Sequence, residues 1–316
     1  AKYAVACSNA TSALQISLKI IDVKKKDEVL VPTLTFISSV NAIVLNGASP
    51  IFMDVDDFHN IDADKTINFL KENTFFKNGY TFNKRSKKRI KALIIVHVWG
   101  NAANLYKLLK FCKKKNIDIV EDAAESLGTK YSISSLKNKH TGTLGRVGCI
   151  SFNGNKIITT GGGGMLLTNE KKLNRLARYY FNQAKDDTVK SIHNDIGFNY
   201  RISNMQAALG IAQLKKINFF IKKKKMIRKT YQRLINKLDN FTLEKTPDYS
   251  FNNNWMNVVK FKRSNKLNTE NLVKYFYKHK IQVRPIWFLN HKQKPYKAYE
   301  KYKITNAKKI IDSCLC

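Results

Sequence analysis

The stretch from Ala92 to Val98 constrains the fold of this chain more than any other part of its sequence. Apart from His97, every residue in it is apolar, and the run is too short to be a buried helix. A short, continuous apolar run is typical of a parallel β-strand that is covered on both faces. Because parallel strands are joined by crossovers that are usually helices, the run predicts a sheet with helices on either side.

Further short apolar runs alternate with helical patterns from residue 1 to about residue 165. The clearest helical pattern lies between Ser12 and Ile21, where Leu14, Leu18 and Ile21 recur at helical spacing. Strands are predicted at Glu28–Val31, Ile51–Val55, Ile117–Val120 and Val147–Phe152. This alternation predicts an α/β domain with a mostly parallel central sheet.

The pattern changes near Asn204. A helix is predicted from Met205 to Leu214, and the segment from Phe219 to Leu238 either continues it or forms a second helix. Beyond residue 240 we predict a half-exposed strand, a helix and an extended segment, in the order Met256–Phe261, Asn268–His279 and Ile281–Arg284. We therefore expect a large domain at residues 1–215 and a smaller α+β domain at residues 216–316, joined through a helix.

The formal net charge of +34 raises the question of a nucleic-acid partner. The basic excess is carried by lysine, with only ten arginines among the 57 basic residues, and it is spread along the whole chain. Arginine is the preferred residue for bidentate phosphate and base contacts. We interpret the lysines as solvated surface residues that reflect a compositional bias, and we predict no nucleic-acid partner. An anionic ligand such as a sugar nucleotide would still benefit from the charge.

The five cysteines are scattered, and their spacing matches neither a zinc site nor a redox pair. We therefore predict no metal and interpret the cysteines as reduced thiols of a cytoplasmic protein. No apolar run reaches the roughly 18 to 20 residues needed to span a membrane, so no membrane partner is predicted. The sequence begins at Ala1, already inside predicted structure, and we expect both ends to be truncated.

Three polar segments follow predicted strands or open a predicted helix. Asp122 follows the strand ending at Val120, and Lys156 follows the strand ending at Phe152. The segment from Ser8 to Leu14 opens the first helix with small polar residues, which offer free N–H groups to an anion. Ligands of open α/β sheets bind beyond the carboxyl ends of the strands. Taken singly, each residue has an ordinary explanation as a helix cap, a core residue or a surface lysine.

Together these segments supply what pyridoxal phosphate requires: a phosphate cradle, an acid and a lysine. A partly desolvated lysine such as Lys156 can form a Schiff base, and Asp122 would keep the pyridine nitrogen of the cofactor protonated. Phe36, after the strand predicted at Glu28–Val31, could stack on the pyridine ring. The four glycines at positions 161–164 lack the spacing of a P-loop, which argues against a nucleoside triphosphatase.

These segments resemble the DegT/DnrJ-type family of nucleotide-sugar aminotransferases over nearly the whole chain. The resemblance implies the three-layer fold of aspartate aminotransferase (fold type I), with a smaller α+β C-terminal domain. The matching segments are the phosphate turn around Thr11 and Ser12, Pro32–Phe36, Val96–Asn101, Glu121–Gly128, the Lys156 segment, Gly197–Arg201, Gln206–Gly210 and Arg284–Trp287. Two departures are Ala10, where many members have glycine, and the truncated ends.

By this resemblance, Lys156 and Asp122 are the catalytic residues. Thr11, Ser12 and Ser151 would hold the cofactor phosphate, Phe36 would stack on the ring, and Glu125 would lie near the ring hydroxyl. Asn199 would reach the phosphate of the cofactor bound by a neighbouring subunit, so the resemblance implies a homodimer with shared active sites.

Within the family, the sequence motifs Ser151–Lys156 and Arg284–Trp287 most resemble those of enzymes that aminate C4 of UDP-linked 4-keto-6-deoxy-N-acetylhexosamines. Those enzymes serve the pathways to bacillosamine or legionaminic acid. The resemblance therefore implies transfer of an amino group from L-glutamate to such a sugar, for cell-surface polysaccharide or glycan biosynthesis. A C3 aminotransferase, an enzyme of a dTDP- or GDP-linked sugar, and a non-catalytic basic binding or regulatory protein remain alternatives.

Overall fold

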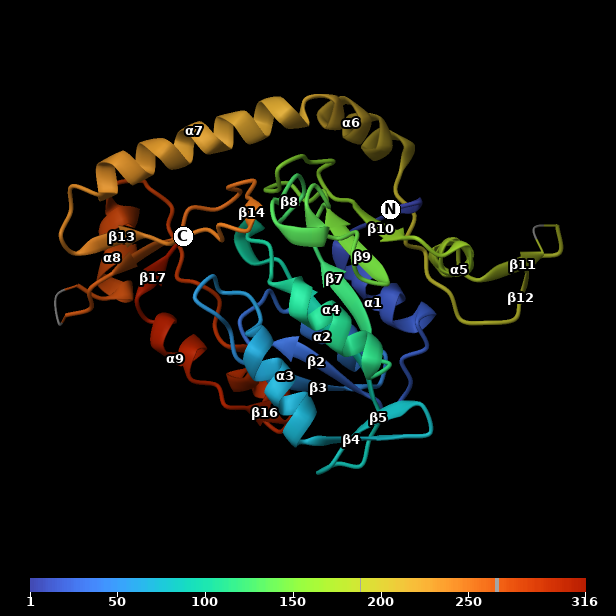
Figure 1. Cartoon of the computed structure of the whole chain (residues 1–316). Helices are drawn as coiled ribbons and strands as arrows, with labels where there is room; N and C mark the ends of the chain where they lie inside the picture. Colours follow the sequence, from blue (N-terminus) through green and yellow to red (C-terminus); the bar gives the residue numbers. More distant parts are fainter. Residues whose placement is uncertain (188, 265–266) are drawn as a thin grey trace.

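The computed structural model describes residues 1–187, 189–264 and 267–316. Its main feature is an eight-stranded sheet (Figure 1) in the order β1-β10-β9-β7-β6-β2-β3-β16. The strands are β1 Tyr3–Cys7, β2 Glu28–Pro32, β3 Ser49–Met53, β6 Ile90–Val96, β7 Asp118–Asp122, β9 Val147–Ser151, β10 Gly164–Thr168 and β16 Lys301–Tyr302. Pairing is parallel from β9 to β16 and antiparallel at β1 and β10. The predicted mostly parallel sheet is confirmed.

The apolar run around residue 95 forms the central strand β6, and its side chains alternate between two buried cores. Ala92, Ile94 and Val96 face one core, and Leu93 and Ile95 face the other. Burial on both faces explains why the strand is apolar throughout rather than alternating.

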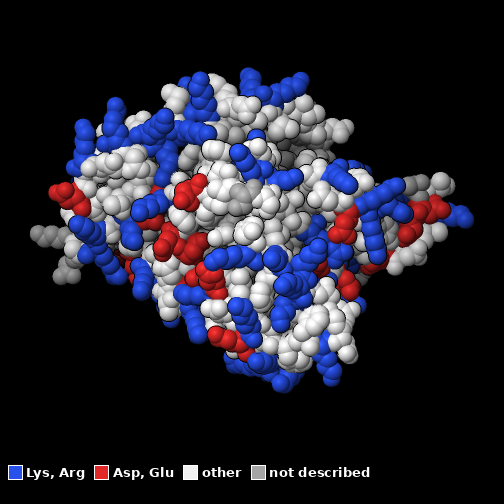
Figure 2. Space-filling model, viewed as in Figure 1, with Lys and Arg blue, Asp and Glu red and all other residues white. Residues whose placement is uncertain are grey.

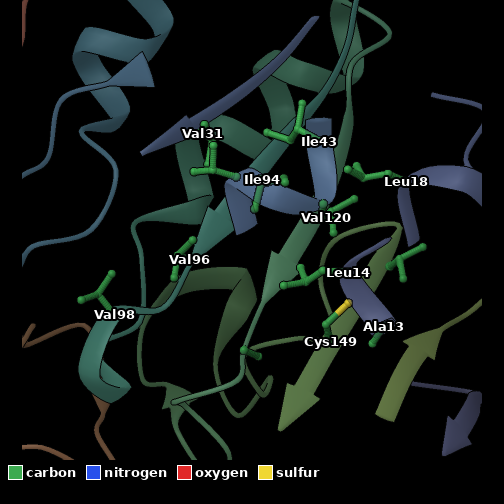
Figure 3. Packing of buried hydrophobic residues seen from close by; sticks show 14 of the residues in the cluster. Ala13, Leu14, Leu18, Val31, Ile43, Ile94, Val96, Val98, Val120 and Cys149 are labelled. Carbon is green, nitrogen blue, oxygen red and sulfur yellow. The ribbon is translucent and has the colours of Figure 1, made fainter. Parts of the chain in front are cut away.

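Helices cover both faces of the sheet and complete three layers. On one face α1 Ala10–Ile20, α2 Ser38–Leu45 and α5 Lys171–Phe181 pack against the first core. Figure 3 shows Leu14 and Leu18 of α1 and Ile43 of α2 among the residues of this core. On the other face α3 Ala63–Glu72 and α4 Leu105–Lys114 pack against the second core. This arrangement confirms the predicted α/β class.

The strand β7 extends two residues beyond the predicted end at Val120. Glu121 and Asp122 pair with Ile95 and Val96 of β6, and Asp122 also pairs with Cys149 of β9. Asp122 is therefore the last residue of the strand rather than a residue of the following loop, and neighbouring strands on both sides fix its position.

The C-terminal part begins with two separate helices, α6 Asn204–Lys215 and α7 Ile217–Ile235. In Figure 1, α7 runs along the top of the molecule towards a three-stranded sheet and α8 Thr269–Lys278. The strands of this sheet are β13 Phe241–Leu243, β15 Val259–Phe261 and β17 Cys314–Leu315. Short elements elsewhere are β4 Thr74–Lys77, β5 Tyr80–Asn83, β8 Lys130–Tyr131, β11 Lys185–Asp187, β12 Ile192–His193, β14 Ser250–Phe251, α9 Asn306–Ile310 and the 3₁₀ turns Val98–Gly100, Ser134–Leu136, Asn290–Lys292 and Lys294–Tyr296.

Two predicted extended segments differ from the structure. The strand predicted from Met256 to Phe261 begins only at Val259, although the Val258 carbonyl still accepts a hydrogen bond from the Glu244 N–H after β13. The segment Ile281–Arg284 forms no strand, although Arg284 exchanges two backbone hydrogen bonds with Cys316.

The last part of the chain returns to the main sheet. Strand β16 lies parallel to β3, and Ile286, Leu289 and Tyr296 pack into the first core. The division at residues 215 and 216 stays a prediction. In the described ranges, no helix has the length and apolar character needed to cross a lipid bilayer.

Basic side chains are distributed over many elements. Figure 2 shows lysine and arginine over the whole visible face, dense along its upper edge, with acidic residues in smaller groups between them. This distribution on the visible face agrees with the interpretation of the lysines as solvated surface residues.

Candidate active site

The carboxyl ends of β2, β7 and β9 lie at one edge of the sheet, since these strands are parallel. Phe36 follows β2, Asp122 ends β7 with Glu125 three residues on, and Lys156 follows β9. The structure brings two of these side chains into contact: Lys156 Nζ lies 3.4 Å from Glu125 Oε1. Both are largely buried, with side-chain exposures of 14% for Lys156 and 7% for Glu125.

Asp122 is a buried carboxylate that forms no ion pair with any of the residues that the structure describes. Its Oδ2 accepts a hydrogen bond from Ser39 Oγ at 2.6 Å, and its Oδ1 accepts one from the Ala124 N–H at 3.1 Å. Burial raises the pKa of Asp122, while these two donors and the charge of Lys156 oppose that rise. A cationic N–H next to the carboxylate would stabilise its charged form. The protonated pyridine nitrogen of pyridoxal phosphate is such a group.

Glu125 joins Lys156 to the loop that follows β6. Its Oε2 accepts a hydrogen bond from the backbone N–H of Trp99 at 2.8 Å. Burial raises the pKa of Glu125, and the nearby Lys156 charge opposes the rise most strongly. Trp99 has φ of 53°, an uncommon conformation for a residue other than glycine. Asn60 holds this loop by accepting from the Val98 N–H at 2.9 Å and donating to the Ala102 carbonyl at 3.1 Å.

The start of α1 lies against the glycine tract, as a phosphate cradle requires. Asn9 caps the helix by accepting from the Ser12 N–H at 2.8 Å, and the hydroxyls of Ser8 and Ser12 are 3.3 Å apart. A Cβ on Gly164 would lie 2.6 Å from the carbonyl carbon of Asn9, so only glycine allows this approach. Gly164 pairs with Ser151 across the sheet. Small hydroxyl side chains at a helix start fit a bound phosphate group.

The other predicted phosphate and ring contacts are accessible. Thr11 is exposed in the first turn of α1, and Ala10, the departure from the usual glycine, is accommodated as the first residue of that helix with 8% exposure. Phe36 is 55% exposed and its ring lies 6.3 Å from that of Trp287. Phe36 is therefore not a core residue, and its ring is free to stack on a ligand.

Asn199 precedes Tyr200, whose carbonyl accepts a hydrogen bond from the Ser8 N–H at 2.7 Å at the start of the predicted phosphate cradle. It is exposed and pairs with Asn182 in the segment that follows β12. Among the described residues, no hydrogen bond or ion pair joins it to Lys156, Asp122, Ser12 or Ser151. Its predicted contact with a neighbouring subunit stays a prediction.

The segment from Asn252 to Trp255 contacts the site and was not predicted to do so. Asn253 Nδ2 donates to the carbonyls of Glu125 at 2.9 Å and Leu127 at 3.0 Å. Trp255 is 6% exposed, and the Nζ of Lys156 lies 4.1 Å from the centroid of its ring system. Three consecutive asparagines are unusual in a strand and could have signalled an irregular, hydrogen-bonding segment.

The sequence matches the DegT/DnrJ/EryC1/StrS aminotransferase family over residues 1–316. The chain belongs to this family. Members of the family are pyridoxal phosphate-dependent aminotransferases of sugar nucleotides, which confirms the predicted cofactor and enzyme class. The predicted resemblance is confirmed at this level.

Individual relatives agree with this assignment. The chain is 34% identical over 295 residues to the putative pyridoxal phosphate-dependent aminotransferase EpsN of Bacillus subtilis, covering 92% of this chain and 71% of that protein. It is 33% identical over 304 residues to GDP-perosamine synthase of Escherichia coli O157:H7, covering 96% and 77%. A DegT/DnrJ/EryC1/StrS aminotransferase from Brucella abortus has the same fold, with a TM-score of 0.86, 24% identity and coverage of 99% and 79%. These findings confirm the predicted fold type I architecture.

Proposed function

We propose that this enzyme transfers the amino group of L-glutamate to the C4 ketone of a UDP-linked 4-keto-6-deoxy sugar, for the synthesis of a cell-surface polysaccharide or glycan. The observation that carries the proposal is the partly buried Lys156 amine beside Glu125, at the same sheet edge as Asp122. Family membership supports amino transfer to a sugar nucleotide. The sequence motif around Lys156 supports amination at C4 of the sugar and a UDP-linked substrate.

The residues present fit pyridoxal phosphate. Thr11, Ser12 and Ser151 would hold the phosphate, Asp122 would pair with the pyridine nitrogen, and Phe36 would cover the ring. The buried Asp122, whose carboxylate accepts hydrogen bonds only from neutral donors among the described residues, and the close packing allowed by Gly164 support this assignment. Bound pyridoxal phosphate supplies the electron sink that makes the donor's Cα–H bond acidic.

In this proposal Lys156 has two tasks. Its Nζ binds the cofactor in the resting enzyme. Once released, the amine accepts the proton of the donor carbon and later returns a proton to the carbon of the acceptor sugar. Glu125, 3.4 Å from Nζ, keeps the released amine near the site. Burial of both side chains limits the access of water to the amine during proton transfer.

A GDP-linked sugar is the second candidate substrate, because a relative of 33% identity is GDP-perosamine synthase. The chemistry at the sugar ketone and the roles of Lys156 and Asp122 would be the same. The two candidates differ only in the nucleotide and hexose that the acceptor pocket selects.

Assay of the purified enzyme with ¹⁵N-glutamate and a panel of keto-sugar nucleotides tests the proposal. We expect ¹⁵N at C4 of the UDP-linked 4-keto-6-deoxy-N-acetylhexosamine, with kcat/KM at least about 100-fold above that for dTDP-, GDP- and 3-keto substrates. The labelled carbon is identified by NMR of the product. Preferential labelling of a GDP-sugar would support the second candidate, and labelling at C3 would contradict both.

We further propose that the enzyme acts as a homodimer in which Asn199 completes the partner's site. None of the described side chains of α6 is buried, although Met205, Ile211 and Leu214 on this helix are apolar and more than half exposed. Asn199 precedes this helix and is itself exposed. An exposed apolar helix of this kind is typical of a subunit interface.

Mixed dimers test this arrangement. Asn199→Asp, which sets a negative charge towards the partner's cofactor phosphate, and Lys156→Ala should each be nearly inactive alone. Refolded or co-expressed together, they should recover about a quarter of wild-type activity, because half of randomly mixed dimers carry one intact site of two. Activity no greater than that of the separate variants would contradict a shared site.

A further inference from the structure

The amine of Lys156 has a second neighbour besides Glu125. Its Nζ lies over the indole ring of Trp255, 4.1 Å from the ring centroid. We propose that Trp255 is a positioning residue that holds the Lys156 ammonium whenever Nζ is released from the cofactor. This inference rests on the proposed function, because it assumes that Lys156 is the amine that moves the proton.

Hydrogen bonds from both the ring and the backbone of Trp255 fix its position relative to the site. Its Nε1 donates to the carbonyl of Asn155, the residue before Lys156, at 2.6 Å. Its backbone N–H donates to Asn253 Oδ1 at 2.9 Å, and Asn253 in turn donates to the carbonyl of Glu125. The ring is thus anchored to the two loops that carry Lys156 and Glu125. Such anchoring maintains the face of the ring under the amine.

The two neighbours of Nζ stabilise its charge in different ways. The distance of 3.4 Å to Glu125 exceeds that of a strong charge-assisted hydrogen bond, and burial raises the pKa of this carboxyl group. Glu125 is therefore a weak partner for a cation when considered alone. The indole face attracts a cation through its quadrupole, does not titrate, and is most effective in a desolvated site such as this one.

This placement bears on proton transfer. When the donor's Cα–H bond breaks, the proton forms a new N–H bond at Nζ, and the bonding electron pair is left on Cα, where bound pyridoxal phosphate would delocalise it. The amine thereby becomes an ammonium ion, and it becomes a neutral amine again when it returns a proton to a carbon. After Lys156 accepts a proton and before it returns one, Trp255 holds the ammonium ion over the indole ring. The amine therefore stays out of solvent while it is charged.

The first test uses the cofactor-free protein and does not depend on activity. In protein labelled with [ε-¹³C]lysine, the Lys156 signal, identified by its absence in Lys156→Arg, should be shifted upfield by the ring current of the indole. The shift should be smaller in Trp255→Phe and absent in Trp255→Leu. Met256→Leu changes the neighbouring residue of the same segment and should leave the signal unchanged.

The second test is the single-turnover reaction of the holoenzyme with glutamate. Trp255→Leu should lower the rate constant about 10-fold and Trp255→Phe about 3-fold, because the cation–π attraction decreases in the order Trp, Phe, aliphatic. The glutamate concentration that gives half of the maximal rate constant should change by less than about 2-fold. The isotope effect with α-deuterated glutamate should increase, which a general packing defect would not cause. If the leucine variant fails to fold, the phenylalanine variant alone decides.

The results separate this inference from the proposed function. An unshifted Lys156 signal in the wild-type protein, or wild-type rate constants in both Trp255 variants, would overturn the role of Trp255 alone. Continued turnover after loss of the Lys156 amine would instead overturn the proposed function, whatever the Trp255 variants do.

Discussion

Lys156→Ala is expected to lower the rate of amino transfer by at least about 1000-fold. The substitution removes both the amine that binds the cofactor and the base that moves the proton, and proton transfer by a positioned side chain alone contributes about 100- to 10,000-fold. Alanine also leaves Glu125 without its 3.4 Å partner. The rate should be measured in a single turnover with glutamate, by the change in cofactor absorbance.

Three comparisons make this result specific to the Lys156 amine. Lys171→Ala, at an exposed position at the start of α5, should have wild-type activity. Lys156→Arg keeps a positive charge but has no titratable amine, and it should be as inactive as the alanine variant. A small free amine such as ethylamine should restore part of the activity of Lys156→Ala. Multiple turnovers by the alanine variant without added amine would contradict the role of Lys156.

Sequence reasoning found the sheet and the residues at its edge because both follow from local patterns. The apolar run around Ile94 reports burial on two faces, and that burial is a property of one strand. Parallel strands end at a common edge, so the predicted ends near Val120 and Phe152 were enough to associate Asp122 with Lys156. The error of two residues at the end of β7 did not matter for this argument.

Features that depend on distant partners were not predicted. Trp255 is separated from Asn155 by 100 residues, and no period or motif in the sequence relates them. Strand β16 has only two residues, Lys301 and Tyr302, and is defined by its pairing with β3. The contact between His97, which follows β6, and Glu121 of β7 likewise depends on how the two strands pair.

Glu121 is a fully buried carboxylate whose hydrogen bonds hold two loops next to the site. Its Oε1 accepts from the N–H groups of Leu144 and Gly145, at 2.6 and 2.5 Å. Its Oε2 accepts from the Gly142 N–H at 2.8 Å and from His97 Nε2 at 2.9 Å. His97 Nδ1 accepts from the Ala103 N–H at 3.1 Å, which leaves the ring proton on Nε2. In this arrangement Glu121 is ionised, and each of the four N–H groups that face it has an acceptor.

Glu121→Gln should therefore destabilise the protein by about 3 kcal/mol at pH 7. The new amide N–H₂ would face backbone or ring donors, so at least one buried donor loses its acceptor. Urea unfolding followed by circular dichroism measures the loss. Glu170→Gln removes a carboxylate that pairs with Arg146 at the surface and should cost less than about 1 kcal/mol. An equal loss of unfolding free energy in the two variants would contradict the conclusion that the buried hydrogen bonds of Glu121 stabilise the fold.

The same variant should change the response to acid. Burial alone would raise the pKa of Glu121, but His97 and the N–H groups of Gly145 and Gly142 lower it below the ordinary value of 4.5. Because the folded pKa is the lower one, ionised Glu121 stabilises the folded state fully above pH 4.5, and this contribution is lost as the pH falls through the folded pKa. The stability difference between wild type and Glu121→Gln should thus stay constant from pH 7 to 5 and narrow below that. A difference independent of pH down to acid unfolding would mean that the pKa of Glu121 is not lowered in the folded enzyme.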